Sequence, residues 1–244
     1  MTLSQSQPAV LLVHGFTGSR TAMLPWAQQL QEAGFQSMVP VLPGHETSWQ
    51  QLARVGFGQW IEAVEHAYDQ LAARHDTVFA AGLSMGGALA LHLATRRRLA
   101  GVSLVNPGLV VDSPLARYAP ALRWVVPSVA PISNNTARPG TDEQAYGRTP
   151  VAAVAQLYKL FAQVRARLGL VDCPVQLFRS SVDDVVSDAS VRALVHGLAP
   201  GVLAEHHQLL HSKHVATLDY DAGQIFMESA RFFAAQAAAQ EEAQ

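Results

Sequence analysis

The chain has 244 residues, of which 49% are hydrophobic and 15% charged, and its formal net charge is −2 at pH 7. This length and apolar content suit one α/β domain with an insertion and exclude a long disordered chain. The charge is too small for a nucleic-acid-binding surface, so we expect no nucleic-acid partner.

The sequence also indicates where the protein works. No apolar window of about 18 residues occurs, and residues 1–7 lack the basic and apolar regions of a signal peptide. We therefore expect a cytoplasmic protein with no integral membrane segment. Its single cysteine, Cys173, excludes an internal disulfide, and we expect it to be a small buried hydrophobe. The sequence leaves the oligomeric state open.

Apolar runs and helix-spaced apolar stripes alternate along most of the chain. Runs without polar alternation are typical of strands that are covered on both faces. They predict strands at residues 9–13, 35–41, 78–81, 101–105, 175–179 and 202–210. Amphipathic helices are predicted between them, for example from the stripe of Trp60, Val64 and Leu71. This alternation predicts an α/β fold, with a mostly parallel central sheet flanked by helices.

The alternation stops between residues 108 and 172, where six of the 13 prolines lie. Proline shortens helices and is excluded from central strands. One clear helix is predicted in this stretch, from a stripe that includes Val154, Leu157 and Phe161. We interpret residues 108–172 as a cap inserted into a core made of residues 1–107 and 173–244. The alternative is that the stretch is an irregular part of the core.

Residues 82–86, Gly-Leu-Ser-Met-Gly, lie between a predicted strand and a run of good helix formers. In this context G-x-S-x-G predicts a nucleophile elbow, a tight turn that exposes the hydroxyl of Ser84 above the sheet. Glycines two residues before and after the serine remove side chains that would collide with the backbone. The alternative is a chance glycine-serine turn, and the strand and helix on either side argue against it.

Four loops follow the carboxyl ends of predicted strands, where open parallel sheets gather their reactive groups. These loops contain residues 14–18, Ser84, Asp183 with Asp184, and His214. The order of serine, aspartate and histidine is that of α/β-hydrolases. The sequence resembles the bacterial carboxylesterase and monoacylglycerol lipase branch of that superfamily, and the matching pieces are residues 14–19, 43–45, 82–87, 181–186 and 212–215.

The resemblance implies the α/β-hydrolase fold and a serine hydrolase of carboxylic esters. It also implies short- to medium-chain esters and monoacylglycerols as small-molecule substrates, an acyl-enzyme intermediate and no cofactor. A serine hydroxyl needs a base and the base needs a carboxylate, so we expect Ser84, His214 and one aspartate to be catalytic. The backbone N–H groups of Phe16 and Met85 are expected to form the oxyanion hole.

Two neighbouring carboxylates compete for the third catalytic position. Successive side chains in extended backbone point in opposite directions, so only Asp183 or Asp184 can comfortably face His214. The family pattern has its aspartate two residues before paired valines, and the resemblance therefore selects Asp183.

The apolar content of the cap suits an acyl or aromatic group, and we expect Trp124 and Phe161 to line the substrate pocket. His206, His207 and His211 lie close in sequence to the expected base, but no cysteine or carboxylate cluster joins them, so we expect no metal site. Two alternatives to ester hydrolysis stay open. The same triad can cleave thioesters, lactones or C–C bonds, and the same fold can serve a non-catalytic ligand-binding protein.

Overall fold

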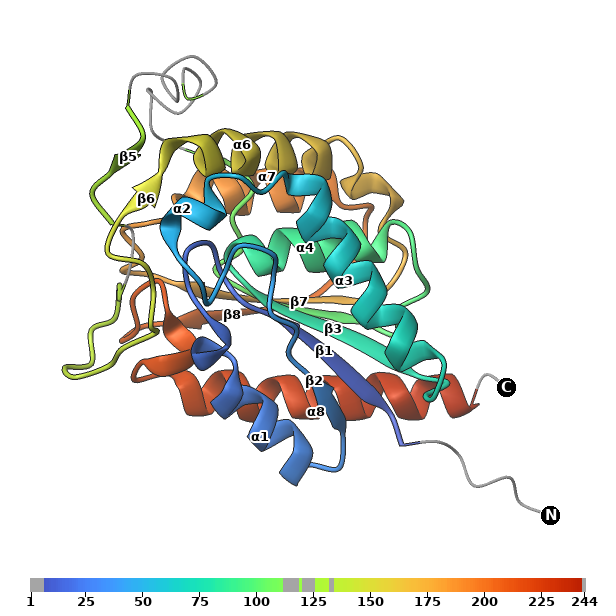
Figure 1. The fold of residues 1–244 in the computed structure, drawn as a ribbon. Coiled ribbons are helices and arrows are strands. Elements are labelled where there is room, and N and C mark those ends of the chain that lie inside the picture. Colours follow the sequence, from blue (N-terminus) through green and yellow to red (C-terminus); the bar gives the residue numbers. More distant parts are fainter. Residues whose placement is uncertain (1–6, 112–118, 120–125, 132–133, 243–244) are drawn as a thin grey trace.

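The computed structural model of the protein describes residues 7–111, 119, 126–131 and 134–242, and Figure 1 shows its fold. Six strands form one sheet in the spatial order β2-β1-β3-β4-β7-β8. Their bounds are β1 Ala9–Val13, β2 Gln36–Met38, β3 Val78–Leu83, β4 Val102–Val105, β7 Val175–Ser180 and β8 Leu203–Leu209. Every pair of neighbouring strands is parallel, which confirms the predicted parallel sheet.

Helices cover both faces of the sheet (Figure 1). One face carries α1 Leu24–Glu32 and α8 Ala222–Glu242, and the other carries α3 Phe57–Ala72, α4 Met85–Ala94, α6 Val151–Arg165 and α7 Asp188–Gly197. Because both faces are covered, every residue of β1 and β3 is buried, which explains their unbroken apolar sequences. α4 is buried on all sides, in keeping with its Ala, Leu and Gly composition.

The structure differs from the predicted elements where these are short or lie at the sheet edge. The strand expected at residues 35–41 is shortened to β2, an edge strand, because Pro40 follows it and proline cannot donate to a ladder. The sequence does not predict α2 Trp49–Leu52, nor the antiparallel pair of β5 Ser128–Val129 with β6 Thr149–Pro150. Elements of two to four residues are too short to leave a periodic apolar pattern.

The proline-rich insertion lies between β4 and β7, which are neighbours in the sheet. Its helix α6 begins directly after Pro150. Leu160, Phe161 and Val164 of α6 belong to the same buried apolar cluster as side chains of α3 and α4. The helix is therefore continuous with the core, and the boundaries of a separate cap at residues 108 and 172 stay a prediction.

Cys173 lies just before β7, and its thiol is buried in that same apolar cluster. Burial raises the pKa of the thiol to about 12. The side chain therefore packs as a small hydrophobe, and it stays in its thiol form at neutral pH.

In the part of the chain that the structure describes, no helix has both the length and the apolar character needed to cross a bilayer. The longest of these helices, α8, has 21 residues. It is apolar on one side only, where Ile225, Phe232 and Phe233 pack against the sheet.

Candidate active site

Ser84 forms the turn between β3 and α4, with φ of 55° and ψ of −116°. This conformation is strained for a residue that has a side chain. A Cβ at Gly82 would collide with the backbone of Gly86, and a Cβ at Gly86 would collide with the carbonyl of Val13. The tight turn predicted from the glycine spacing is therefore present. At Gly15, by contrast, an added Cβ would make only ordinary van der Waals contact with Ser84.

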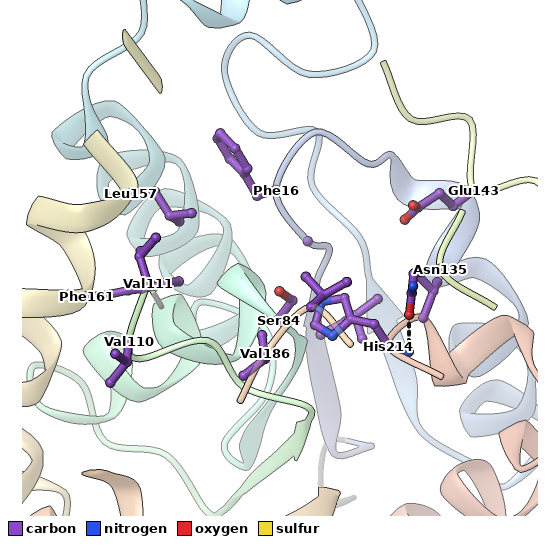
Figure 2. Close-up of a pocket in the computed structure, with 14 residues that line it drawn as sticks. Phe16, Ser84, Val110, Val111, Asn135, Glu143, Leu157, Phe161, Val186 and His214 are labelled. Atoms are coloured by element: carbon purple, nitrogen blue, oxygen red, sulfur yellow. Dashed lines mark hydrogen bonds between the residues drawn. The ribbon is translucent and has the colours of Figure 1, made fainter. Parts of the chain in front are cut away.

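His214 lies on the loop after β8, and its ring is nearly buried. Nδ1 of the ring is 2.9 Å from Oδ2 of Asp183. Because an ionised carboxylate can only accept a hydrogen bond, Nδ1 carries the proton and Nε2 can take one up. Ser84 and His214 line the same cavity (Figure 2). The structure thus brings together the three side chains that the sequence predicts as a triad.

The side chain of Asp183 is fully buried, and both of its oxygens accept hydrogen bonds. Oδ1 accepts from the N–H groups of Val185 and Val186 at 2.8 and 3.0 Å. Oδ2 accepts from His214 and, at 2.7 Å, from Nη1 of Arg179. Burial by itself raises the pKa of this carboxyl, but His214 and the two backbone N–H groups outweigh burial and hold the pKa below its usual value. Asp183 is therefore ionised at neutral pH.

The neighbouring carboxylate, Asp184, forms an ion pair with a lysine. Its side chain is 55% exposed, and Oδ2 lies 3.0 Å from Nζ of Lys213. An exposed ion pair of this kind contributes little to stability. The geometry therefore brings Asp183, and not Asp184, to the histidine ring.

The two N–H groups expected to bind an oxyanion come from the start of α4 and from the loop after β1. Met85 is the first residue of α4, so its N–H has no acceptor within the helix. Phe16 lies on the loop after β1 and lines the cavity. His14 anchors this loop, because its Nδ1 donates to the carbonyl of Gly15 at 3.0 Å and its Nε2 accepts from the N–H of Leu42 at 3.4 Å.

The ring of His14 packs edge-on against that of His45, with 4.8 Å between the ring centroids. Burial lowers the pKa of His14 to about 4 and that of His45 to about 3. Both rings are therefore neutral at neutral pH, as the donor and acceptor roles of His14 require. Trp60 also packs edge-on against His45, at a centroid distance of 6.1 Å. The loop that carries Phe16 is thus supported by the packing of two neutral histidine rings and the Trp60 ring.

The cavity at Ser84 has two chemically different sides (Figure 2). One side is apolar and is lined by Val110, Val111, Leu157 and Phe161. The other side carries Asn135 and Glu143, which lie across the cavity from these apolar side chains. A ligand placed at Ser84 therefore meets hydrocarbon in one direction and hydrogen-bonding groups in the other.

Glu143 is buried at the polar side of the cavity. Its Oε1 accepts a hydrogen bond of 2.6 Å from the backbone N–H of Asn134. Burial raises the pKa of the Glu143 carboxyl above its usual value, and it outweighs the lowering effects of the Asn134 N–H and of the neighbouring His214 ring. The carboxyl can accept from a ligand hydroxyl when ionised and can also donate to one when protonated.

Of the two residues expected to line the substrate pocket, Phe161 lines the cavity and Trp124 lies outside the described residues. The absence of a side chain at Gly108 makes room for the Phe161 ring, since a Cβ there would lie 2.6 Å from Cζ. In the described ranges, no three His, Cys, Asp or Glu side chains are arranged to hold a metal ion. His207 instead stacks on Phe178, with 4.9 Å between their ring centroids.

Three polar residues at the site are not found by sequence analysis. Arg179 could have been noticed in the sequence, because it is the only charged residue of the mostly apolar run that forms β7. Asn135 and Glu143 leave none, because they lie in a proline-rich stretch without helical or strand periodicity. Only the folded chain shows that these two residues line the cavity.

Residues 4–215 match a hydrolase family described as serine aminopeptidase, S33. The chain belongs to this family. This S33 family member is 37% identical over 227 residues to a thermostable monoacylglycerol lipase of Bacillus sp. strain H-257, and the match covers 92% of the chain and 90% of that protein. It is 23% identical over 235 residues to a carboxylesterase of Bacillus subtilis strain 168, and this match covers 95% of the chain and 94% of that protein.

A solved structure supports the same assignment for this S33 family member. A structure from work on LipS and LipT, two metagenome-derived lipolytic enzymes, matches with a TM-score of 0.88 and 32% identity, and the match covers 94% of each chain. Together these relatives confirm the α/β-hydrolase fold and the family resemblance drawn from the sequence. They also confirm the prediction of a carboxylic ester hydrolase.

Proposed function

We propose that this protein cleaves esters of a single short- to medium-chain fatty acid with a small polyol, monoacylglycerols among them. The two-sided cavity at Ser84 carries this proposal. The side lined by Val111, Leu157 and Phe161 suits an acyl chain, and the side with Glu143 suits the hydroxyls of the alcohol. The relative named a thermostable monoacylglycerol lipase, 37% identical to this chain, supports the same substrate class.

In the proposed reaction, Oγ of Ser84 attacks the ester carbonyl while Nε2 of His214 takes up the hydroxyl proton. Asp183 holds Nδ1 of the ring through the 2.9 Å hydrogen bond, which keeps Nε2 free for this step and stabilises the imidazolium that forms. The protonated ring then donates to the leaving alcohol oxygen as the C–O bond breaks. The alcohol departs and an acyl group stays on Ser84.

The negative charge on the tetrahedral intermediate is stabilised by the backbone N–H groups of Met85 and Phe16. The positive end of the α4 dipole adds to this stabilisation, because Met85 is the first residue of the helix. In the second half of the reaction, water gives a proton to His214 and attacks the acyl group. The bond between the acyl carbon and Oγ then breaks, His214 returns its proton to Oγ of Ser84, and the fatty acid leaves.

Two features distinguish this proposal from its alternatives. Thioesters, lactones and C–C bonds are cleaved by the same triad, but the buried Glu143 favours a leaving group that carries hydroxyls. A non-catalytic binding protein has no need of a serine in a strained elbow, and the φ of 55° at Ser84 therefore favours catalysis.

The proposal is tested by Glu143→Leu, which keeps the side-chain size and removes the carboxyl. We expect kcat/KM for monolauroylglycerol to fall by about tenfold, since one hydrogen bond to the polyol is lost. We expect kcat/KM for p-nitrophenyl laurate, which has the same acyl chain and no hydroxyl on its leaving group, to change by less than about twofold. Both are measured by initial rates of fatty acid release.

Asp142→Asn serves as the matched control, because Asp142 is the adjacent exposed carboxylate and does not line the cavity. A wild-type protein that cleaves acyl thioesters or lactones and leaves both laurate esters intact would contradict the proposal. So would an equal loss on both esters in Glu143→Leu, because the carboxyl would then act on something other than the alcohol.

The apolar side of the cavity is probed by Phe161→Leu, which replaces the aromatic ring with a smaller side chain that is also apolar. We expect the ratio of kcat/KM for octanoate to that for acetate p-nitrophenyl esters to rise by about tenfold, because the longer chain gains space and the shorter one does not reach the ring. Phe226→Leu is the control, since Phe226 stacks on Trp26 away from the cavity. An unchanged ratio would show that Phe161 does not contact the acyl chain.

A further inference from the structure

The backbone of His214 is held at both ends by asparagine side chains. Oδ1 of Asn135 accepts from the His214 N–H at 3.0 Å, and Nδ2 of Asn106 donates to the His214 carbonyl at 2.9 Å. The backbone carbonyl of Asn135 also accepts from the N–H of Val215 at 2.9 Å. Figure 2 shows the bond from the Asn135 side chain as a dashed line beside His214.

The two asparagines come from different parts of the chain. Asn106 directly follows β4 and is fully buried. It accepts from the N–H of Ser180, at the end of β7, at 2.8 Å, so it is fixed to the carboxyl end of the sheet. Asn135 lies in the proline-rich insertion, 79 residues before His214. The histidine loop is therefore attached to the sheet on one side and to the insertion on the other.

The buried carboxylate of Asp219 fixes the stretch that carries Asn135 to the histidine loop. Its oxygens accept from the N–H groups of Ala137 at 2.6 Å and Arg138 at 2.9 Å, which lie in the insertion. The same carboxylate accepts from the N–H of Lys213 at 2.9 Å, next to the histidine. The Asp219 side chain thus connects the insertion to the loop that carries His214.

The other end of this stretch is bonded to the loop after β1. Oγ of Ser19 donates to the carbonyl of Glu143 at 2.8 Å, and the N–H of Tyr146 donates to the carbonyl of Thr17 at 3.1 Å. Residues 134–146 therefore bridge the loop that carries Phe16 and the loop that carries the base.

We propose that Asn135 is a positioning residue for His214, through which the insertion sets the place of the general base. The proposal rests on the proposed function, in which His214 takes the proton from Ser84. Among the described residues, the ring is hydrogen-bonded only at Nδ1, so its reach toward the serine depends on where its backbone lies. Displacements of about 1 Å in such groups cost on the order of 100-fold in rate.

The test compares Asn135→Ala with Asn135→Asp, which keeps an oxygen acceptor for the His214 N–H. In Asn135→Ala we expect kcat to fall by about 10- to 100-fold with little change in KM. The factor should be the same for p-nitrophenyl laurate, methyl laurate and monolauroylglycerol, because the base serves every leaving group. Asn135→Asp should recover most of the lost kcat. Thr136→Val is the matched control, since the Thr136 hydroxyl bonds within the insertion and not to the histidine loop.

A second readout reports on the ring itself. The low-field proton resonance of the Nδ1–H bonded to Asp183 should broaden in Asn135→Ala and sharpen again in Asn135→Asp. If Asn135→Ala does not fold, Asn135→Leu gives the same comparison, because it keeps the side-chain shape without the acceptor. A kcat within twofold of wild type, or a loss that differs between the three leaving groups, overturns the proposal. Inactive Ser84→Ala beside fully active Asn135→Ala overturns this inference alone, whereas active Ser84→Ala overturns the proposed function.

Discussion

Ser84→Ala is expected to lower kcat for p-nitrophenyl esters by on the order of 10⁶-fold, since the substitution removes the proposed nucleophile and leaves its base without a partner. The thermal unfolding midpoint should change little, because alanine has the same backbone preferences at the strained turn. A phosphonate that reacts with activated serines should add one mass to the wild type and none to the variant. Initial rates and intact mass spectrometry measure the two effects.

Ser181→Ala is the matched control for this experiment. Ser181 is an exposed serine directly after β7, and its hydroxyl donates to the carbonyl of Leu209 at 3.1 Å. We expect wild-type turnover and wild-type labelling in this variant. Labelling of Ser84→Ala by the phosphonate would assign the nucleophile to another residue.

The second large effect is expected for Asp183→Asn. The amide no longer fixes the histidine tautomer that leaves Nε2 free, and kcat should fall by about 10⁴-fold. The same substitution leaves the largely buried guanidinium of Arg179 without its closest carboxylate, so we also expect the free energy of unfolding to fall by about 3 kcal/mol. Asp184→Asn removes only an exposed ion pair with Lys213 and should change stability by less than about 0.5 kcal/mol.

The stability difference between wild type and Asp183→Asn should depend on pH. The folded pKa of Asp183 is lowered, so its carboxylate stabilises the fold above the unfolded pKa of about 3.9, and this contribution is lost as the pH falls through the folded value. Urea unfolding of both proteins should therefore give a gap that is constant near neutrality and closes in acid. A large loss of kcat in Asp184→Asn with a mild one in Asp183→Asn would reverse the two roles.

Much of the fold follows from local patterns in the sequence. Buried parallel strands leave continuous apolar runs, and the glycines around Ser84 leave a signature because a Cβ at Gly82 or Gly86 has no room. The choice between Asp183 and Asp184 needed the family resemblance, since alternation alone leaves both open. The structure gives the physical reason that sequence could not, because it shows Asp183 bonded to the N–H groups of the two valines that follow.

The groups that hold the site together are harder to predict. Asn106 was open to detection, because it is a polar residue directly after a buried strand, where parallel sheets carry their functional groups. Asn135 and Glu143 were not, since they lie in an irregular stretch that is hydrogen-bonded to loops 79 and 124 residues away. Contacts of that kind depend on tertiary packing, which local propensity does not encode.

The burial of Cys173 makes this enzyme convenient for site-specific chemistry. It is the only cysteine of the chain, and its thiol, with a pKa of about 12, stays un-ionised and shielded under ordinary labelling conditions. A cysteine introduced on the exposed surface of the insertion would react with a maleimide dye while Cys173 stays unlabelled. Fluorescence can therefore test whether the insertion moves relative to the sheet, without first deleting a native thiol.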